Sequence, residues 1–257
     1  MGSTGGPSKI RRSSNNQRYK TFHSDIVHEP FGPEHYEDDG GATADWFMRH
    51  TNAEELYDIV DSFNADYVDG YDAFDYWARG YFMRGQQYRG FDRLDEDEQA
   101  MTRIFDTVLD QGTNDTGFEV VRRASWVMLG DGISKYESQP DTIRAFLNDM
   151  KGQTIINRGN MSTAAADSGL LISVDARERP VEFHIKVPAN SKGAGMWIGD
   201  YRVNPGWEDG QREFMFNRDS LFKIGTYHYS KKKDCWIVNL TWRGHTEHDY
   251  GSNTLYS

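Results

Sequence analysis

Apolar residues recur at helical spacing through the first half of the chain. Leu56, Ile59, Val60 and Phe63 follow the i, i+3, i+4, i+7 pattern of an amphipathic helix. A cap for this helix is expected at Thr51 or Asn52. Two more stripes with this spacing predict helices, and their apolar residues are Phe74, Trp77, Ala78 and Tyr81 in the first and Met101, Ile104, Phe105 and Val108 in the second. This half of the chain therefore predicts a small helical lobe.

From Gly117 onward the pattern changes to short apolar runs separated by Gly, Asn, Asp and Pro, which is typical of strands and turns. The predicted strands cover residues 118–122, 154–156, 170–174, 181–187, 214–216, 221–229 and 235–242. One predicted helix interrupts them, with Asp141 as its cap and Gly152 at its end. Helices followed by mostly antiparallel strands indicate an α+β fold, with a β-sandwich-like core.

These patterns predict one domain over residues 42–245, made of a helical lobe (42–116) and a β core (117–245). We expect residues 1–41 to form an irregular extension, basic at first and then acidic at 37–39. The alternative for the basic part is an arm that contacts nucleic acid. Residues 246–257 are expected to form a frayed polar tail. Lys231–Lys233 lies between two predicted strands and is expected at a solvated hairpin tip, with a nucleic-acid contact as the alternative.

Charge and cysteine content narrow the function classes. The chain has 40 acidic and 29 basic residues, a net charge of −11, which argues against a large basic footprint for duplex nucleic acid or an anionic membrane. Cys235 is the one cysteine, so a disulfide framework is excluded, and its apolar setting predicts a core residue. With no apolar leader and no long apolar run, we expect a cytoplasmic protein without a membrane partner.

Three short segments carry the candidate chemistry. The first is an apolar strand that ends in arginine, Val120-Val121-Arg122-Arg123-Ala124. The second is a Gly/Asn turn that runs into a Ser-Thr pair, Gly159-Asn160-Met161-Ser162-Thr163-Ala164. The third is a loop that enters an apolar strand, Gly210-Gln211-Arg212-Glu213-Phe214. In the third segment Gln211 and Glu213 are expected on the same side of a strand, because strand side chains alternate.

The residue types suit cleavage of the glycosidic bond of NAD. Arg122 can pair with the pyrophosphate through its planar fork of donors. Ser162 can hold the nicotinamide ribose or orient the glutamate. Glu213 can bind the ribose 2′-hydroxyl and stabilise the oxocarbenium-like charge as nicotinamide leaves. Gln211 is a neutral donor and acceptor for the incoming nucleophile.

In this order the segments resemble the Arg, Ser-Thr-Ser and Glu-x-Glu signature of the toxin-type mono-ADP-ribosyltransferases. The later runs Val181–Pro188, Lys192–Gly199 and Glu213–Ile224 are similar in order and spacing to the second half of that family, so the resemblance covers residues 117–240. It implies NAD as co-substrate and no metal. It further implies a catalytic group of Glu213, Gln211 and Ser162, and an NAD-binding group of Arg122, Arg123, Ser162 and Thr163.

Three departures from the signature matter. Arg122 is followed by Arg123 where the family usually has Gly, so the two share the assignment, with Arg122 favoured. The third Ser-Thr-Ser residue is Ala164. Gln211 replaces the first glutamate, which resembles the clostridial exoenzymes that modify an asparagine of Rho GTPases and the pierisin-like enzymes that modify guanine. We therefore expect a protein side chain other than arginine as acceptor, with an RNA or DNA base as the alternative.

The loop over residues 200–210 corresponds to the target-recognition loop of the family, so Tyr201 and Trp207 are candidate contacts. The expected setting is a toxin, a phage effector or a defence enzyme, and an antitoxin or inhibitor protein is a further expected partner. Two other hypotheses remain: an NAD glycohydrolase with water as acceptor, and a degenerate module that keeps only the fold.

Two further patterns are set aside. His245, Glu247 and His248 lie in the polar tail, where paired histidines more often bind nothing, so no metal is expected. Gly193-Ala-Gly195 lacks the strand before and the helix after that a dinucleotide fingerprint needs, and is expected to be a turn.

Overall fold

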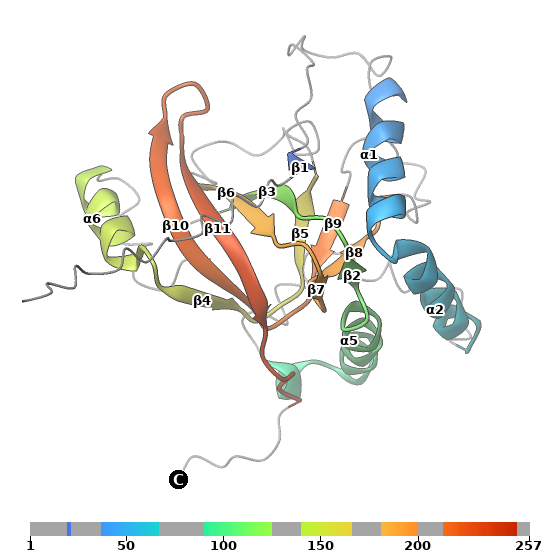
Figure 1. Cartoon of the computed structure of the whole chain (residues 1–257). Coiled ribbons are helices and arrows are strands. Elements are labelled where there is room, and N and C mark those ends of the chain that lie inside the picture. Colours follow the sequence, from blue (N-terminus) through green and yellow to red (C-terminus); the bar gives the residue numbers. More distant parts are fainter. Residues whose placement is uncertain are drawn as a thin grey trace, which may run out of the picture.

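The computed structural model of the chain describes residues 20–21, 37–66, 90–124, 140–165, 181–199 and 213–250 (Figure 1). Its helices are α1 (Glu37–His50), α2 (Ala53–Asp66), the short 3-10 helix η2 (Phe91–Arg93), α5 (Glu96–Leu109) and α6 (Pro140–Met150). Its strands are β1 (Lys20–Thr21), β2 (Thr113–Asn114), β3 (Phe118–Ala124), β4 (Thr154–Asn157), β5 (Met161–Ala164), β6 (Val181–Val187), β7 (Ser191–Lys192), β8 (Gly195–Trp197), β9 (Glu213–Phe216), β10 (Ser220–Ser230) and β11 (Cys235–His245). The predicted helix at 74–81 and the predicted strand at 170–174 lie outside the described residues.

The predicted helices within the described ranges are confirmed. Helix α5 begins with a capping box, in which Asp95 accepts from the Glu98 amide at 2.8 Å and Glu98 accepts from the Asp95 amide at 3.1 Å. Helix α6 begins at Pro140, which has no amide hydrogen to satisfy. The expectation that Asp141 precedes the helix as its cap was therefore wrong, because the helix begins two residues earlier than that cap implies.

Helix α1 is an element that the sequence did not predict. It begins at Glu37, inside the stretch expected to be irregular. Phe47 is fully buried and stacks on Trp197, with ring centroids 4.4 Å apart and planes 3° apart. This aromatic packing anchors α1 to the sheet.

Nine of the described strands form one mixed sheet, and β2 and β7 pair with each other separately. Among the described residues its order is β4-β10-β11-β6-β3-β5-β9-β8, with β1 added alongside β3. Most neighbours are antiparallel, as predicted, while β6–β11 and β1–β3 are parallel. Strands β3 and β5 pair through Val121 and Ala164, which joins the two halves of the sheet.

Two buried clusters hold the sheet to its helices. In Figure 1, α6 lies beside β10 and β4, whereas α1, α2 and α5 lie beside β8 and β9. The larger cluster joins Phe47 of α1 and Leu147 of α6 to residues of the central strands, while the smaller joins Leu56 of α2 and Phe105 of α5 to β8 and β9. Strand β9 contributes to both, because Phe214 and Phe216 belong to the larger cluster and Met215 to the smaller.

Gly195 allows the close approach of β8 to β9. Its φ is +142°, and a Cβ at this position would lie 1.8 Å from the Met215 carbonyl oxygen.

The predicted turn at 193–195 is confirmed, since it connects β7 to β8. The predicted hairpin tip is also confirmed, because residues 231–234 form the turn between β10 and β11. Cys235 is fully buried at the start of β11, as expected of a core residue.

The segment after His245 packs on the body of the protein as far as residue 250. Arg218 donates to both oxygens of Asp106 at 2.8–3.0 Å, to Asp219 at 3.0 Å and to the Asp249 carbonyl at 3.1 Å. The expectation of a frayed tail was therefore wrong for residues 246–250. Among the described helices, none has the length and apolar character needed to cross a membrane.

Candidate active site

The three segments with candidate chemistry form three consecutive strands, β3, β5 and β9. Val121 pairs with Ala164, and Ala164 pairs with Glu213, so these residues form one row across the sheet. Segments that are about 40 and 50 residues apart in sequence are thus brought side by side, in the order of the signature. Figure 1 shows the three strands adjacent near the middle of the sheet.

Glu213 and Ser162 lie on the same face of the sheet. Ser162 pairs with Met215, two residues after Glu213, and alternate residues of a strand share a face. Glu213 is only 5% exposed, and Ser162 is half-buried. Their strands are hydrogen-bonded neighbours, which allows the hydroxyl and the carboxylate to serve one ligand.

The position of Glu213 is fixed on both sides of its strand. Its carbonyl accepts from the Ile198 amide at 3.0 Å, and β5 pairs with the other edge of β9. The next residue, Phe214, is buried among Phe47 and Phe118, at ring-centroid distances of 5.9 and 4.9 Å. These contacts fix the backbone of Glu213, and a fixed backbone is what a preorganised carboxylate requires.

Thr163 points to the opposite face from Ser162, because the two are adjacent in β5. It is buried, and its hydroxyl donates to the Phe214 carbonyl at 2.6 Å. This bond ties β5 to β9 next to Glu213. The geometry thus gives Thr163 a clear role in holding the two strands together.

Arg122 links β3 to β5. Its guanidinium donates through Nη1 to the Ser162 carbonyl, and its backbone pairs with Phe183 of β6. The alternation of β3 places Arg122 on the face opposite Val121, whose row contains Glu213. Arg123 pairs with Glu182 through its backbone, and its side chain lies outside the described part of the chain. The choice between the two arginines stays a prediction.

Gln211, Tyr201 and Trp207 lie outside the described residues, which resume at Glu213. The expected placement of Gln211 beside Glu213 and the expected target-recognition contacts therefore stay predictions as well.

A charged histidine lies in the same row as Glu213, on the far side of β3. Val121 pairs with His184 of β6, whose Nδ1 lies 3.1 Å from Glu119 and whose Nε2 lies 2.8 Å from Glu182. Burial disfavours the charged ring, but the hydrogen bonds with the two carboxylates outweigh it and raise the pKa of His184 to about 9. Burial disfavours the Glu182 carboxylate too, but hydrogen bonds from His184 and Lys233 lower its pKa to about 2.

This pair predicts a bell-shaped contribution to stability. The Glu182 contribution is complete above its ordinary pKa of 4.5 and is lost as pH falls toward 2, whereas the His184 contribution is complete below 6.5 and is lost as pH rises through 9. His184→Gln should therefore lower the free energy of unfolding most between pH 4.5 and 6.5, by about 1.5–3 kcal/mol.

Urea unfolding of both proteins across this pH range is the measurement, with the exposed His228→Gln as the control. A loss of stability that does not vary with pH would contradict the ion pair.

Comparison with solved structures identifies the fold. BECa, an ADP-ribosylating toxin of Clostridium perfringens solved with NADH, is 15% identical, with a TM-score of 0.61 over 81% of this chain and 49% of its own. Plx2a, an ADP-ribosyltransferase toxin from Paenibacillus larvae, is 14% identical, with a TM-score of 0.58 over 81% and 97%. The Clostridium limosum C3 exoenzyme is 15% identical, with a TM-score of 0.56 over 85% and 98%. The chain has the fold of the ADP-ribosyltransferases.

The family follows from the sequence itself. Residues 71–242 match the model of the ADP-ribosyltransferase exoenzymes, so the chain belongs to this family. It is an NAD-dependent mono-ADP-ribosyltransferase, and the α+β class and the resemblance inferred from the sequence are confirmed. A comparison with curated protein sequences found no match.

Proposed function

We propose that this enzyme transfers ADP-ribose from NAD to a protein side chain other than arginine, with Glu213 as its catalytic carboxylate. The observation that carries the proposal is the row from Val121 through Ala164 to Glu213, with Ser162 on the same face of the sheet as Glu213. The setting that fits is a toxin or effector acting on another cell, as Plx2a is a toxin.

NAD would lie across β3, β5 and β9, the strands that carry the three signature segments. The arginine at the end of β3 holds the pyrophosphate, because a guanidinium offers several donors in a plane that matches phosphate oxygens. Ser162 holds the nicotinamide ribose or orients the carboxylate. Thr163 keeps β5 and β9 in register through its bond to the Phe214 carbonyl.

The chemical step is a substitution at C1′ of the nicotinamide ribose. The bond between C1′ and the nicotinamide nitrogen breaks, and its electron pair leaves with nicotinamide, which becomes neutral. The Glu213 carboxylate stabilises the positive charge on the ribose and binds its 2′-hydroxyl. The acceptor atom then bonds to C1′ and loses a proton to water or to a base.

The preference for a non-arginine acceptor rests on Gln211. A carboxylate at this position would pair with a guanidinium, whereas the glutamine amide matches another amide. A base edge could also pair with this amide, so a nucleic acid is the second candidate. The net charge of −11 favours a protein acceptor, because enzymes that act on nucleic acids usually carry many basic residues that neutralise phosphates. Lys233, part of the one basic run of the β core, is already paired with Glu182 at 2.7 Å.

Comparing Arg122→Ala with Arg123→Ala identifies the pyrophosphate ligand. The family resemblance favours Arg122 as this ligand, although the alternation of β3 places it on the face opposite Glu213. Loss of charge-assisted hydrogen bonds worth about 1.5–3 kcal/mol should weaken NAD binding by about 10–100-fold in the variant that removes the ligand, and the other variant is its matched control. NAD titration followed by calorimetry is the measurement, and a larger loss in the Arg123 variant would reverse the assignment.

Labelling with biotinylated NAD tests the acceptor. A cell lysate is treated with the enzyme, and the products are divided between protease and nuclease digestion. We expect the label to be lost to protease and to survive nuclease. Label that survives protease and is lost to ribonuclease or deoxyribonuclease would make a base the acceptor. Release of nicotinamide without any labelled macromolecule would instead indicate an NAD glycohydrolase.

Gln211→Glu is the companion variant. It should reduce labelling of the native acceptor and can create labelling of arginine, which hydroxylamine sensitivity would reveal. Unchanged labelling would remove Gln211 from acceptor recognition while leaving the role of Glu213 intact.

A further inference from the structure

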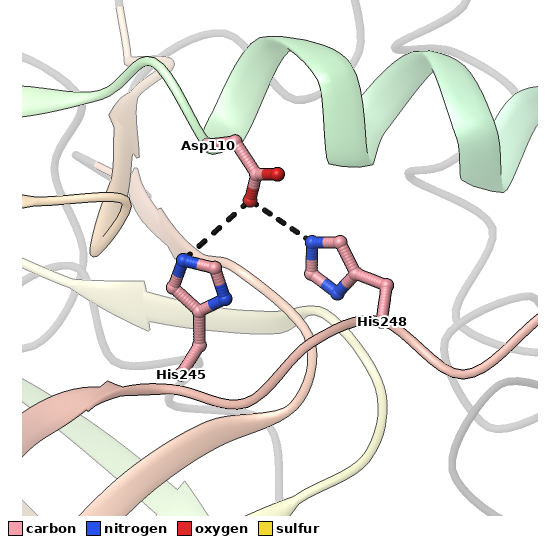
Figure 2. A group of neighbouring side chains, drawn as sticks. All are labelled: Asp110, His245 and His248. Atoms are coloured by element: carbon pink, nitrogen blue, oxygen red, sulfur yellow. Dashed lines mark hydrogen bonds and ion pairs between the residues drawn. The ribbon is translucent and has the colours of Figure 1, made fainter.

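Two histidines converge on one carboxylate at the end of helix α5. Asp110 follows the last residue of α5, while His245 ends β11 and His248 lies three residues later (Figure 2). Oδ1 of Asp110 lies 2.9 Å from Nε2 of His248 and 3.6 Å from Nε2 of His245. The three candidate ligand atoms lie within 4.8 Å of one another. Each Nε2 atom can either donate a hydrogen bond to this oxygen or bind a metal ion together with it.

The separations of Asp110 from the two rings are close to those of a tetrahedral metal site, and the ring nitrogens lie within 4.8 Å of each other. Zinc binds histidine nitrogen and carboxylate oxygen at about 2.0–2.2 Å, so tetrahedral ligand atoms lie about 3.3–3.6 Å apart. The observed 2.9 and 3.6 Å bracket this range. The set offers two imidazoles and one carboxylate, which leaves a fourth position for water.

In both rings the nitrogen that does not face Asp110 lies close to an oxygen acceptor, as is usual for metal-binding histidines. Nδ1 of His245 lies 2.9 Å from the Thr246 carbonyl, which can only accept, so this nitrogen carries the proton and leaves Nε2 to bind a metal. Nδ1 of His248 lies 3.4 Å from the Asp219 carboxylate. Asp110 itself accepts from the Asn217 amide at 2.6 Å. Such outer bonds fix the tautomer and the orientation of ligands.

Gly193 makes room for the first ring. A Cβ at this position would lie 2.6 Å from Nε2 of His245, and Gly193 has a φ of +73°. The two histidine rings lie nearly parallel, with planes 12° apart and centroids 5.2 Å apart. This geometry lets both nitrogens point toward Asp110.

We propose that Asp110, His245 and His248 bind one zinc ion. The metal connects the segment after β11 to the end of α5. Because Asp110 accepts from Asn217, the residue that follows β9, the metal also connects both to that strand. Its role is to hold these elements together at a distance from the chemistry, and it takes no part in the transfer. The proposal reverses the expectation from sequence that the two histidines bind nothing.

A zinc titration of protein first freed of metal by a chelator tests the site. We expect calorimetry to give one zinc ion per chain and the melting temperature to rise as zinc is added. Cobalt in place of zinc should produce the visible absorption of a tetrahedral site. None of these readings depends on transferase activity. Absence of saturable one-to-one binding would overturn the proposal, and the two contacts with Asp110 would then be direct interactions of the rings with the carboxylate.

The variants His245→Gln and His248→Gln assign the metal to these residues. Each removes one of three ligands and should weaken zinc binding by more than about 100-fold, beyond the 10–100-fold typical of changes around the ligands. His228→Gln, on the exposed part of β10, is the matched control and should bind zinc as the parent does. His245 makes few other contacts, so its variant should fold. Retention of full affinity in the His245 variant would place the zinc elsewhere and overturn the assignment.

Discussion

Glu213→Gln is expected to slow ADP-ribosyl transfer by about 10²–10³-fold, while the affinity for NAD stays within a few-fold of the parent. The glutamine keeps the size of the side chain and its hydrogen-bonding capacity, but it lacks the charge that stabilises the ribose cation. Because that charge develops only as nicotinamide leaves, its loss affects the transition state more than the bound ground state.

Single-turnover release of nicotinamide, together with NAD titration, separates these two effects. Glu213 is buried on a strand that is held at both edges, so the variant must first be shown to unfold at a similar urea concentration. Glu55→Gln, at an exposed position of α2, is the matched control and should react at the parental rate. A folded Glu213→Gln enzyme with unchanged turnover would exclude this residue as the catalytic carboxylate.

Arg218→Met is expected to lower the free energy of unfolding by about 3–5 kcal/mol, the largest effect on stability among these variants. Arg218 is 5% exposed at its side chain, and its two carboxylate partners, Asp106 and Asp219, are 2% and 1% exposed. Removal of the guanidinium leaves Asp106 buried with the His248 ring, at 3.7 Å, in place of a bidentate cation. Although Arg158 also reaches Asp219, at 3.0 Å, it cannot replace the bidentate pair with Asp106.

Equilibrium unfolding in urea measures this loss. Arg103→Met is the matched control, since Arg103 is an exposed arginine that packs over Phe91 at 4.5 Å from the ring centroid. Its loss should cost about 0.5–1 kcal/mol. Adding Asp106→Leu to the Arg218 variant should recover part of the stability, because the buried charge left without its guanidinium is then removed. Equal losses in the two arginine variants would show that the buried pair contributes no more than a surface contact.

The strands with clear boundaries could be predicted from the sequence. Strand β6 has the predicted bounds because Pro180 and Pro188 flank a run of alternately apolar residues. Strand β5 was expected only as the end of a turn, since Met161–Ala164 has four residues and two hydroxyl side chains. Its strand conformation comes from β3 and β9, which pair with it on either side. That information is absent from the segment itself.

Helix α1 was missed for a related reason. Gly40 and Gly41 lower the helix propensity near its start, and the acidic residues at 37–39 resemble a solvated segment. The packing of Phe47 on Trp197 outweighs this local preference, and the two residues are 150 positions apart.

The residues of the candidate site and their order along the chain could be predicted, but the pairing of their strands could not. The sequence indicated which segments carry Arg122, Ser162 and Glu213, and the family resemblance supplied the order. That β3 meets β5 through Val121 and Ala164 follows only from the fold. The contact of Asp110 with the two histidines could not be predicted, because these residues lie 135 and 138 positions further along the chain.

The central place of β11 has a consequence for synthesis of the chain. Strand β11 lies between β10 and β6, yet it is made long after β6. A ribosome that has released residues 181–187 has therefore exposed an apolar strand whose parallel partner does not yet exist. Strand β6 can pair earlier with β3, but β10 and β4 join the rest of the sheet only through β11, so the sheet can close only once residue 245 has emerged. Nascent chains stalled before β11 should remain bound to chaperones, while chains released after it should fold.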